Sequence, residues 1–240
     1  MMINVVIFDI DNTLYSYDAA HKVAFQALAD SFCGAFGVPQ GQFSQLHREA
    51  DRILRARVGR PCAAVHNRLI RYQIMLEQIG KPVSYAPGLA DKYWGTLLSN
   101  MQCAPGAREC MSFLKSAGYT VGIGTNMTAD YQFAKLERLG LLGYVDFLVS
   151  SEEAGAEKPD GKLFVCCVEK AGCRADACMF VGDSLEGDAL GAMRAGLRSV
   201  WLCGEEPAAG LPAGIEVIHS LADIPDLLRS LQTRSEKCIR

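Results

Sequence analysis

Short apolar runs alternate with amphipathic segments along much of the chain, and this alternation predicts the fold. Val5–Phe8 is a continuous apolar run that ends in acidic residues, as expected of a strand buried on both faces. Further apolar runs occupy residues 119–123, 145–149, 177–181 and 197–202. Helical patterns separate them, over residues 107–117, 129–139, 162–171 and 185–195. The alternation predicts an α/β fold, a doubly wound (Rossmann-like) parallel sheet covered by helices on both faces.

The pattern changes between residues 17 and 102, where helical periodicity continues without a convincing strand. Glycine–proline pairs punctuate this stretch at residues 37–39, 59–61 and 80–82. We therefore expect an all-helical cap domain of about four helices over residues 17–102, inserted into an α/β core formed by residues 1–16 and 103–240. The polar residues 233–240 are expected to fray.

Composition narrows the function classes. The net charge of −3 and the pI near 5.8 argue against binding a nucleic-acid polymer. No apolar run is long enough to cross a bilayer, and the N-terminus lacks the basic start of a signal peptide, so we expect a cytoplasmic protein without a membrane partner. The ten cysteines contain no Cys-x-x-Cys pair, which favours small buried hydrophobic residues in a reducing compartment.

Polar and charged residues gather where the predicted strands end. Because ligands of open parallel sheets bind at the carboxyl ends of the strands, these residues should converge on one edge. The set comprises Asp9, Asp11, Thr125, Asn126, Lys158, Asp183 and Asp188. Four carboxylates so close together would repel one another, and a lysine with a divalent cation would relieve the repulsion. Oxygen-only ligands favour Mg²⁺.

The same residues form four motifs in a fixed order. They are Asp-x-Asp-x-Thr at Asp9, Thr125 followed by Asn126, Lys158 in Lys-Pro-Asp, and Gly-Asp-Ser-x-x-x-Asp from Gly182 to Asp188. In this order they resemble the haloacid dehalogenase-like hydrolases, and most closely the phosphatase branch with an inserted helical cap. The resemblance covers the whole chain, because the insert lies where this family places its cap. Gly187 departs from the pattern, since many relatives carry asparagine there.

The resemblance implies a role for each residue. Asp9 would be the nucleophile that forms an aspartyl-phosphate, and Asp11 the general acid and base. Phosphate binding would fall to Thr125, Asn126 and Lys158, and catalysis would also need Thr125 and Lys158. The implied ligands of Mg²⁺ are Asp9, Asp183, the backbone carbonyl of Asp11 and, directly or through water, Asp188. The resemblance also implies an active site in the cleft between core and cap.

The acidic residue at position 11 favours phosphate-ester hydrolysis over the other reactions of this family. In the family's dehalogenases this position is not acidic, because no leaving alkoxide needs a proton. The expected function is therefore a Mg²⁺-dependent phosphatase that hydrolyses a small-molecule phosphomonoester such as a nucleotide or sugar phosphate. A phosphomutase of the same fold stays open, as does a non-catalytic regulatory binding protein. The sequence does not name the substrate or the oligomeric state.

Two sequence features, one within the insert and one at its border, each allow two interpretations. Residues 41–80 carry seven arginines and three acids, which indicates either attraction of an anionic substrate or an ordinary solvated helix face. Tyr15, Ser16 and Tyr17 follow the first motif and indicate either contact with the leaving group or hinge packing. The four histidines are scattered without metal-ligand spacing, and no role is assigned to them.

Overall fold

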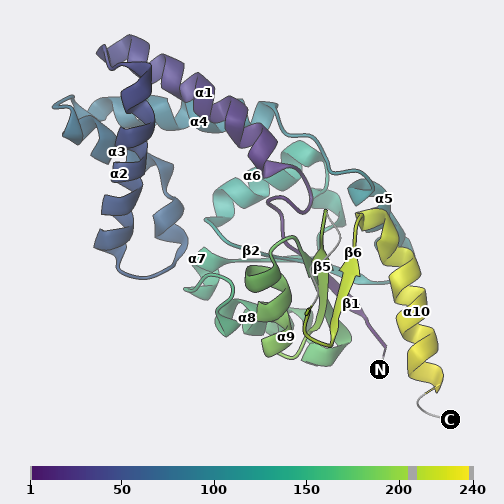
Figure 1. Ribbon diagram of the computed structural model, residues 1–240. Helices are drawn as coiled ribbons and strands as arrows, with labels where there is room; N and C mark the ends of the chain where they lie inside the picture. The colour runs from purple at the N-terminus through teal and green to yellow at the C-terminus, as the bar shows by residue number, and fades with distance from the viewer. Residues whose placement is uncertain (1, 205–209, 238–240) are drawn as a thin grey trace. The chain divides into compact units, whose positions relative to one another are not determined.

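The computed structural model describes residues 2–204 and 210–237. The chain divides into two compact units, one formed by Met1–Ser16 with Gln102–Arg240 and the other by Tyr17–Met101. The first unit contains the sheet, and the second is helical (Figure 1). We refer to them as the sheet unit and the helical cap.

Six parallel strands form the sheet, in the order β3-β2-β1-β4-β5-β6. They are β1 (Val5–Phe8), β2 (Thr120–Thr125), β3 (Phe147–Ser150), β4 (Cys178–Gly182), β5 (Arg198–Leu202) and β6 (Ile215–Ile218). Strand β1 is buried along its whole length because it pairs with β2 on one side and β4 on the other. The strand order reverses at β1, and such a switch point is where doubly wound sheets bind ligands.

Helices cover both faces of the sheet (Figure 1). On one face lie α8 (Gly161–Ala171) and α9 (Gly191–Arg194), which pack against each other and against the strands. The other face carries α5 (Ala107–Ser116) and α10 (Ile224–Lys237), which also contact each other. The remaining elements are α6 (Ala129–Leu139), α7 (Ser151–Ala154), η3 (Leu142–Tyr144), η4 (Ala175–Ala177), η5 (Leu185–Leu190) and η6 (Leu221–Asp223). The predicted doubly wound α/β fold is confirmed.

The cap consists of α1 (Tyr17–Phe36), α2 (Gln40–Val58), α3 (Arg68–Gln78) and α4 (Ala86–Ser99), with the short 3₁₀ turns η1 (Ala63–His66) and η2 (Val83–Tyr85). Helix α1 packs on α4, and α2 packs on α3. Gly59 ends α2 in the left-handed conformation, with φ of 73°, which glycine adopts without strain. The side chain of Asn67 starts α3 by accepting a hydrogen bond from the N–H of Ile70.

Three details differ from the sequence-based expectations. Strand β6 was not predicted, because its short run contains Glu216 and is only partly buried. Residues 233–237 belong to helix α10 rather than to a frayed end, and residues 238–240 lie outside the described range. The predicted helix over residues 185–195 consists of a π-helical turn, η5, followed by α9.

Two findings on the described residues concern cysteine pairing and helix length. None of the nine cysteines within the described ranges forms a disulfide, and four of them are buried. Across the part of the chain described, no helix combines the length and the apolar character needed to span a bilayer.

Candidate active site

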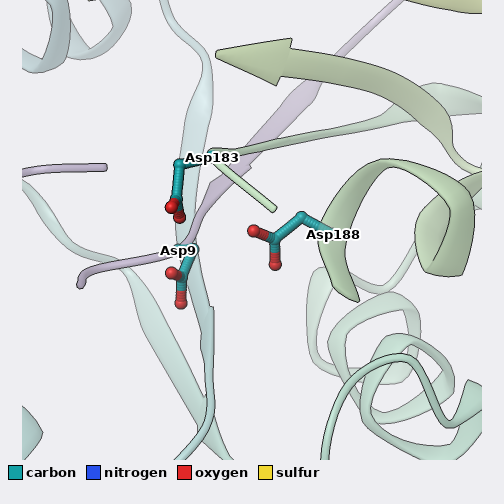
Figure 2. A group of neighbouring side chains, drawn as sticks. All are labelled: Asp9, Asp183 and Asp188. Atoms are coloured by element: carbon teal, nitrogen blue, oxygen red, sulfur yellow. The ribbon is translucent and has the colours of Figure 1, made fainter. Parts of the chain in front are cut away.

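Three aspartates converge at the carboxyl edge of the sheet unit. Asp9 follows β1 directly, and its N–H donates to the carbonyl of Val181, 2.9 Å away, which ties it to β4. Asp183 follows β4, and Asp188 lies on the turn η5. Carboxylate oxygens of the three residues lie within 4.8 Å of one another. Figure 2 shows Asp9, Asp183 and Asp188 turned toward one another.

Gly182 allows this approach. A Cβ at this position would lie 2.3 Å from Oδ2 of Asp188, so any larger residue would displace that carboxylate. The N–H of Ser184 donates to the same Oδ2 over 3.0 Å and fixes the carboxylate. The side chain of Ser184 also accepts a hydrogen bond from the N–H of Gly187. Ser184, and not Asp183, therefore caps the helical turn, which leaves the carboxylate of Asp183 for the site.

Lys158 is the cation of the cluster. Its buried Nζ lies 2.6 Å from Oδ1 of Asp9 and 2.7 Å from Oδ1 of Asp188. The backbone N–H of Lys158 donates to the side-chain oxygen of Asn126 over 2.9 Å. The loop after β2 therefore positions the segment that carries Lys158. Three carboxylates and one ammonium leave a formal charge of −2 in a largely buried cluster.

Burial and mutual repulsion shift the ionisation of the cluster. Burial raises the pKa of Asp9 to about 7, although Lys158 opposes the rise, and the charge of Asp188 adds to it. Burial and Asp188 likewise raise the pKa of Asp183 to about 6. Burial would lower the pKa of Lys158, but Asp188 and Asp9 outweigh it and raise that pKa. The cluster thus has more negative charge than its lysine can offset.

The donor set fits Mg²⁺. The side-chain ligands of this set are all carboxylate oxygens, which this ion prefers over nitrogen or sulfur. Oδ1 of Asp188 lies close to Lys158 but accepts no hydrogen bond of acceptable geometry, so it retains ligand capacity. A divalent cation would also cancel the formal charge of −2.

Asp11 is paired separately. Its two oxygens lie 2.7 and 2.8 Å from Nζ of Lys135, which is fully buried on α6. The hydroxyl of Tyr15 also donates to Asp11. Burial would raise the pKa of Asp11, but the charge and hydrogen bonds of Lys135, with the bond from Tyr15, lower it. The carboxylate of Asp11 is not one of the three that converge on the candidate metal site.

Helix α6 also orders the loop after β2. Gln132 donates from Nε2 to Oγ1 of Thr125 and to the carbonyl oxygen of Asn126, both over 2.7 Å. Met127 has φ of 109°, and its N–H donates to Oγ of Ser151, which holds this uncommon conformation. Gln132 and Lys135 were missed from the sequence, although their spacing of three places both on one helix face.

All seven predicted site residues line a single cavity of about 250 Å³ in the sheet unit. Thr13, from the first motif, lies beside it, and its Oγ1 accepts a hydrogen bond from the N–H of Asp183. The indole N–H of Trp201 donates to the carbonyl of Asp183 over 2.7 Å. This edge of the sheet therefore holds an anionic, oxygen-rich pocket with one lysine inside it and a second behind Asp11.

Comparison with known proteins gives concordant matches. Residues 3–196 match the haloacid dehalogenase-like hydrolase family. A ribulose-1,5-bisphosphate 5-phosphatase of Halopiger xanaduensis is 36% identical over 204 residues, which cover 83% of this chain and 84% of that protein. A glyceraldehyde 3-phosphate phosphatase of Methanothermobacter thermautotrophicus is 30% identical, covering 83% of this chain and 85% of the relative.

A solved structure shares the fold as well. It is described as a 2-haloacid dehalogenase from Pseudomonas syringae, superposes with a TM-score of 0.77 and is 28% identical. The similarity covers 96% of this chain and all of that chain.

Proposed function

The chain belongs to the haloacid dehalogenase-like hydrolases and is a phosphatase, and we propose that it cleaves small-molecule phosphomonoesters with Mg²⁺ through a phosphorylated Asp9. The observation that carries the proposal is the contact of the buried Asp9 carboxylate with Lys158, beside Asp183 and Asp188. Asp11, two residues beyond Asp9, supplies the second carboxyl group that phosphate-ester cleavage requires.

Asp9 and Asp11 divide the reaction into two steps. In the first, an oxygen of Asp9 forms a bond to phosphorus while the ester P–O bond breaks, and the carboxyl group of Asp11 gives its proton to the leaving oxygen. In the second, Asp11 takes a proton from water as the water oxygen attacks phosphorus. The bond to Asp9 then breaks, phosphate leaves, and Asp11 is protonated again. Lys135 favours the ionised form of Asp11 that the second step needs.

The other residues hold the phosphoryl group. Lys158 offsets its negative charge, while Thr125 and Asn126 bind its oxygens. Mg²⁺, held by Asp9, Asp183 and Asp188 with the carbonyl of Asp11, would supply charge compensation between the anionic nucleophile and the anionic ester.

We propose phosphorylated short sugars as the first substrates to test. The relatives described above are named for ribulose-1,5-bisphosphate and glyceraldehyde 3-phosphate, and both match four fifths of the chain. A second cavity of about 690 Å³ in the sheet unit also reaches Asp183 and offers space for the organic part of such a molecule.

The first experiment measures phosphate release from p-nitrophenyl phosphate with Mg²⁺ and with excess chelator. We expect turnover only with the metal, and a loss of at least about 10³-fold in kcat for Asp9→Asn, because an amide cannot serve as the nucleophile. Asp176→Asn, which neutralises a partly exposed carboxylate of the same unit that does not line the cavity, should retain full activity.

Three results would contradict the proposal. They are turnover that persists in chelator, an Asp9→Asn variant as active as the wild type, and a folded protein that hydrolyses no phosphate ester. Phosphorus NMR of the products then separates hydrolysis from phosphate migration, since a phosphatase yields free phosphate and a phosphomutase yields an isomeric sugar phosphate.

A further inference from the structure

The helical cap contains a cationic cavity of about 590 Å³, lined by residues of α1, α2, η1 and α3. Five arginines and a single carboxylate line it, which gives a formal charge of +4 with the histidines counted as neutral. These residues are Arg48, Arg52, Arg55, Arg68, Arg71 and Asp51. All of them lie within Tyr17–Met101, so the cavity belongs to the cap alone.

Arg52 and Arg55 are typical of an ordinary solvated helix face. Arg52 pairs with Glu49 over 2.6 Å, and Arg55 pairs with Asp51 over 2.8 Å. Both arginine side chains are at least half exposed, so water and the neighbouring acids satisfy them. They do not by themselves indicate a ligand.

Arg68 is different, because neutral groups hold it. One Nη donates to the hydroxyls of Tyr17 and Tyr93 over 2.8 and 3.1 Å, and the guanidinium lies 4.5 Å from the centre of the Tyr93 ring. Among the residues that the structure describes, no carboxylate lies within ion-pairing distance of Arg68. Its guanidinium is thus fixed in place without a counter-ion.

Three side chains that line this cavity also have a buried nitrogen atom without a hydrogen-bond partner. Arg71 is only 4% exposed, and it donates to Asp51 and to the carbonyl of Val65. Its Nε is nevertheless buried without a hydrogen-bond partner, and the same is true of Nε of Arg68 and Nε2 of His47. Burying such groups unsatisfied destabilises a protein unless a ligand completes them.

We propose that this cavity binds a phosphate group. Several guanidinium groups from different helices suit a tetrahedral dianion, which accepts hydrogen bonds in several directions, better than a single carboxylate. The pKa of His47 is consistent with a positive potential, because the charges of Arg71 and Arg68 add to the effect of burial and lower it to about 3. The choice of phosphate among the anions rests on the phosphatase function proposed above.

The phosphate has two candidate sources with the same chemistry. It is either a second phosphate group of the substrate or a separate phosphorylated ligand. Both would use Arg68 and Arg71 in the same way, so binding and kinetics must be measured separately.

The binding experiment follows the arginine Nε–Hε signals of the full-length, ¹⁵N-labelled protein by NMR during titration with inorganic phosphate. We expect saturable shifts of the Arg68 and Arg71 signals, which report on the cap and not on the Asp9 site. Arg48→Gln should weaken phosphate binding several-fold, whereas Arg57→Gln should not. Both arginines are exposed on α2, but only Arg48 lines the cavity, so the pair controls for net charge.

Arg68→Gln removes the fixed guanidinium and should abolish the saturable shift of Arg71. If this variant is misfolded, the comparison of Arg48→Gln with Arg57→Gln still decides. Absence of saturable shifts in the wild type, or equal weakening by Arg48→Gln and Arg57→Gln, would overturn the proposal.

Kinetics then assign the source, with ribulose 1,5-bisphosphate and ribulose 5-phosphate as probes. If the cap binds a second substrate phosphate, Arg68→Gln should lower kcat/KM about 10-fold or more for the bisphosphate and leave the monophosphate nearly unchanged. Equal, small effects on both probes, with phosphate binding lost, assign a separate ligand. Failure of the phosphatase proposal looks different, because an inactive protein would still show the cap shifts.

Discussion

At the residue scale, the pair of Lys135 and Asp11 differs from the surface pairs of the same unit. Lys135 is fully buried and contacts both oxygens of Asp11. Lys115 and Asp146 approach as closely, at 2.6 Å, yet their side chains are 35% and 38% exposed. Water reaches both members of the exposed pair, whereas in the other pair it reaches only Asp11, whose side chain is 28% exposed, and not Lys135.

Replacing each lysine by methionine should reveal this difference. We expect Lys135→Met to lower the free energy of unfolding by about 2 kcal/mol, because it removes the buried ammonium that pairs with Asp11, although the hydrogen bond from Tyr15 remains. Lys115→Met should cost about 1 kcal/mol or less. Urea denaturation followed by circular dichroism measures both. Equal costs would mean that water replaces Lys135 as the partner of Asp11.

The residues of the site were predictable to different degrees. Asp9 and Asp183 follow apolar strands directly, so the sequence alone places them at the sheet edge. Lys135 carries no such signal, since a lysine on an amphipathic helix is ordinarily exposed and only tertiary packing shows that it meets Asp11. Trp201 was missed for the same reason, because its bond to the carbonyl of Asp183 joins distant segments.

At the element scale, helices α2 and α3 enclose a histidine that resists protonation. The ring of His47 lies 4.9 Å from that of Phe25, and burial lowers its pKa from 6.5 to about 3, with Arg71 and Arg68 contributing. Between these pH values the unfolded chain binds more protons than the folded chain. The free energy of unfolding therefore falls progressively as the pH drops below about 6.5, because the unfolded chain gains a proton at His47 that the folded chain does not.

His47→Gln should reduce the acid sensitivity of the cap. Between pH 7 and pH 5 we expect the variant to lose up to about 2 kcal/mol less stability than the wild type, since one pKa unit corresponds to about 1.4 kcal/mol. Native-state hydrogen exchange at amides of α2 and α3 measures the free energy of opening at both pH values. The same loss in wild type and variant would show that His47 takes up its proton in the folded cap.

Elements with a clear apolar pattern could be predicted from the sequence, and a partly exposed one could not. Strand β1 was predicted with its observed bounds because all four residues are apolar and buried. Helix α6 was also predicted with its observed bounds, ending before Gly140 in the left-handed conformation. Strand β6 was missed because, among the described strands, it pairs only with β5, and three of its four residues are partly exposed, which weakens the apolar pattern.

At the scale of the whole molecule, the ends of the helical insert lie side by side in the sheet unit. Tyr15 and Cys103 form an antiparallel bridge, and the N–H of Ala104 donates to the carbonyl of Leu14 over 2.8 Å. A short connection can therefore replace the insert without stretching the chain. The three carboxylates of the proposed metal site also belong to the sheet unit.

Replacing residues 17–101 by a short glycine–serine linker should leave a folded sheet unit. We expect Mg²⁺ to stabilise this variant by about 2.7 kcal/mol at a hundred times its dissociation constant, and to raise its Tm accordingly. Asp183→Asn in the same background should remove most of that stabilisation, because it takes away a ligand. An unfolded product, or a Tm indifferent to Mg²⁺, would contradict this expectation.

The central position of β1 has a consequence for synthesis on the ribosome. Val5 pairs with Thr120 on one side and Cys178 on the other, so the strand that leads to Asp9 is made first and finds its neighbours much later. At about 5–20 residues per second, the nascent chain carries this unpaired apolar segment for several seconds. Meanwhile the four cap helices, which pack on one another in a continuous stretch, have fully emerged. Translation thus delivers the cap before the sheet, and the apolar β1 segment stays unpaired in the interval.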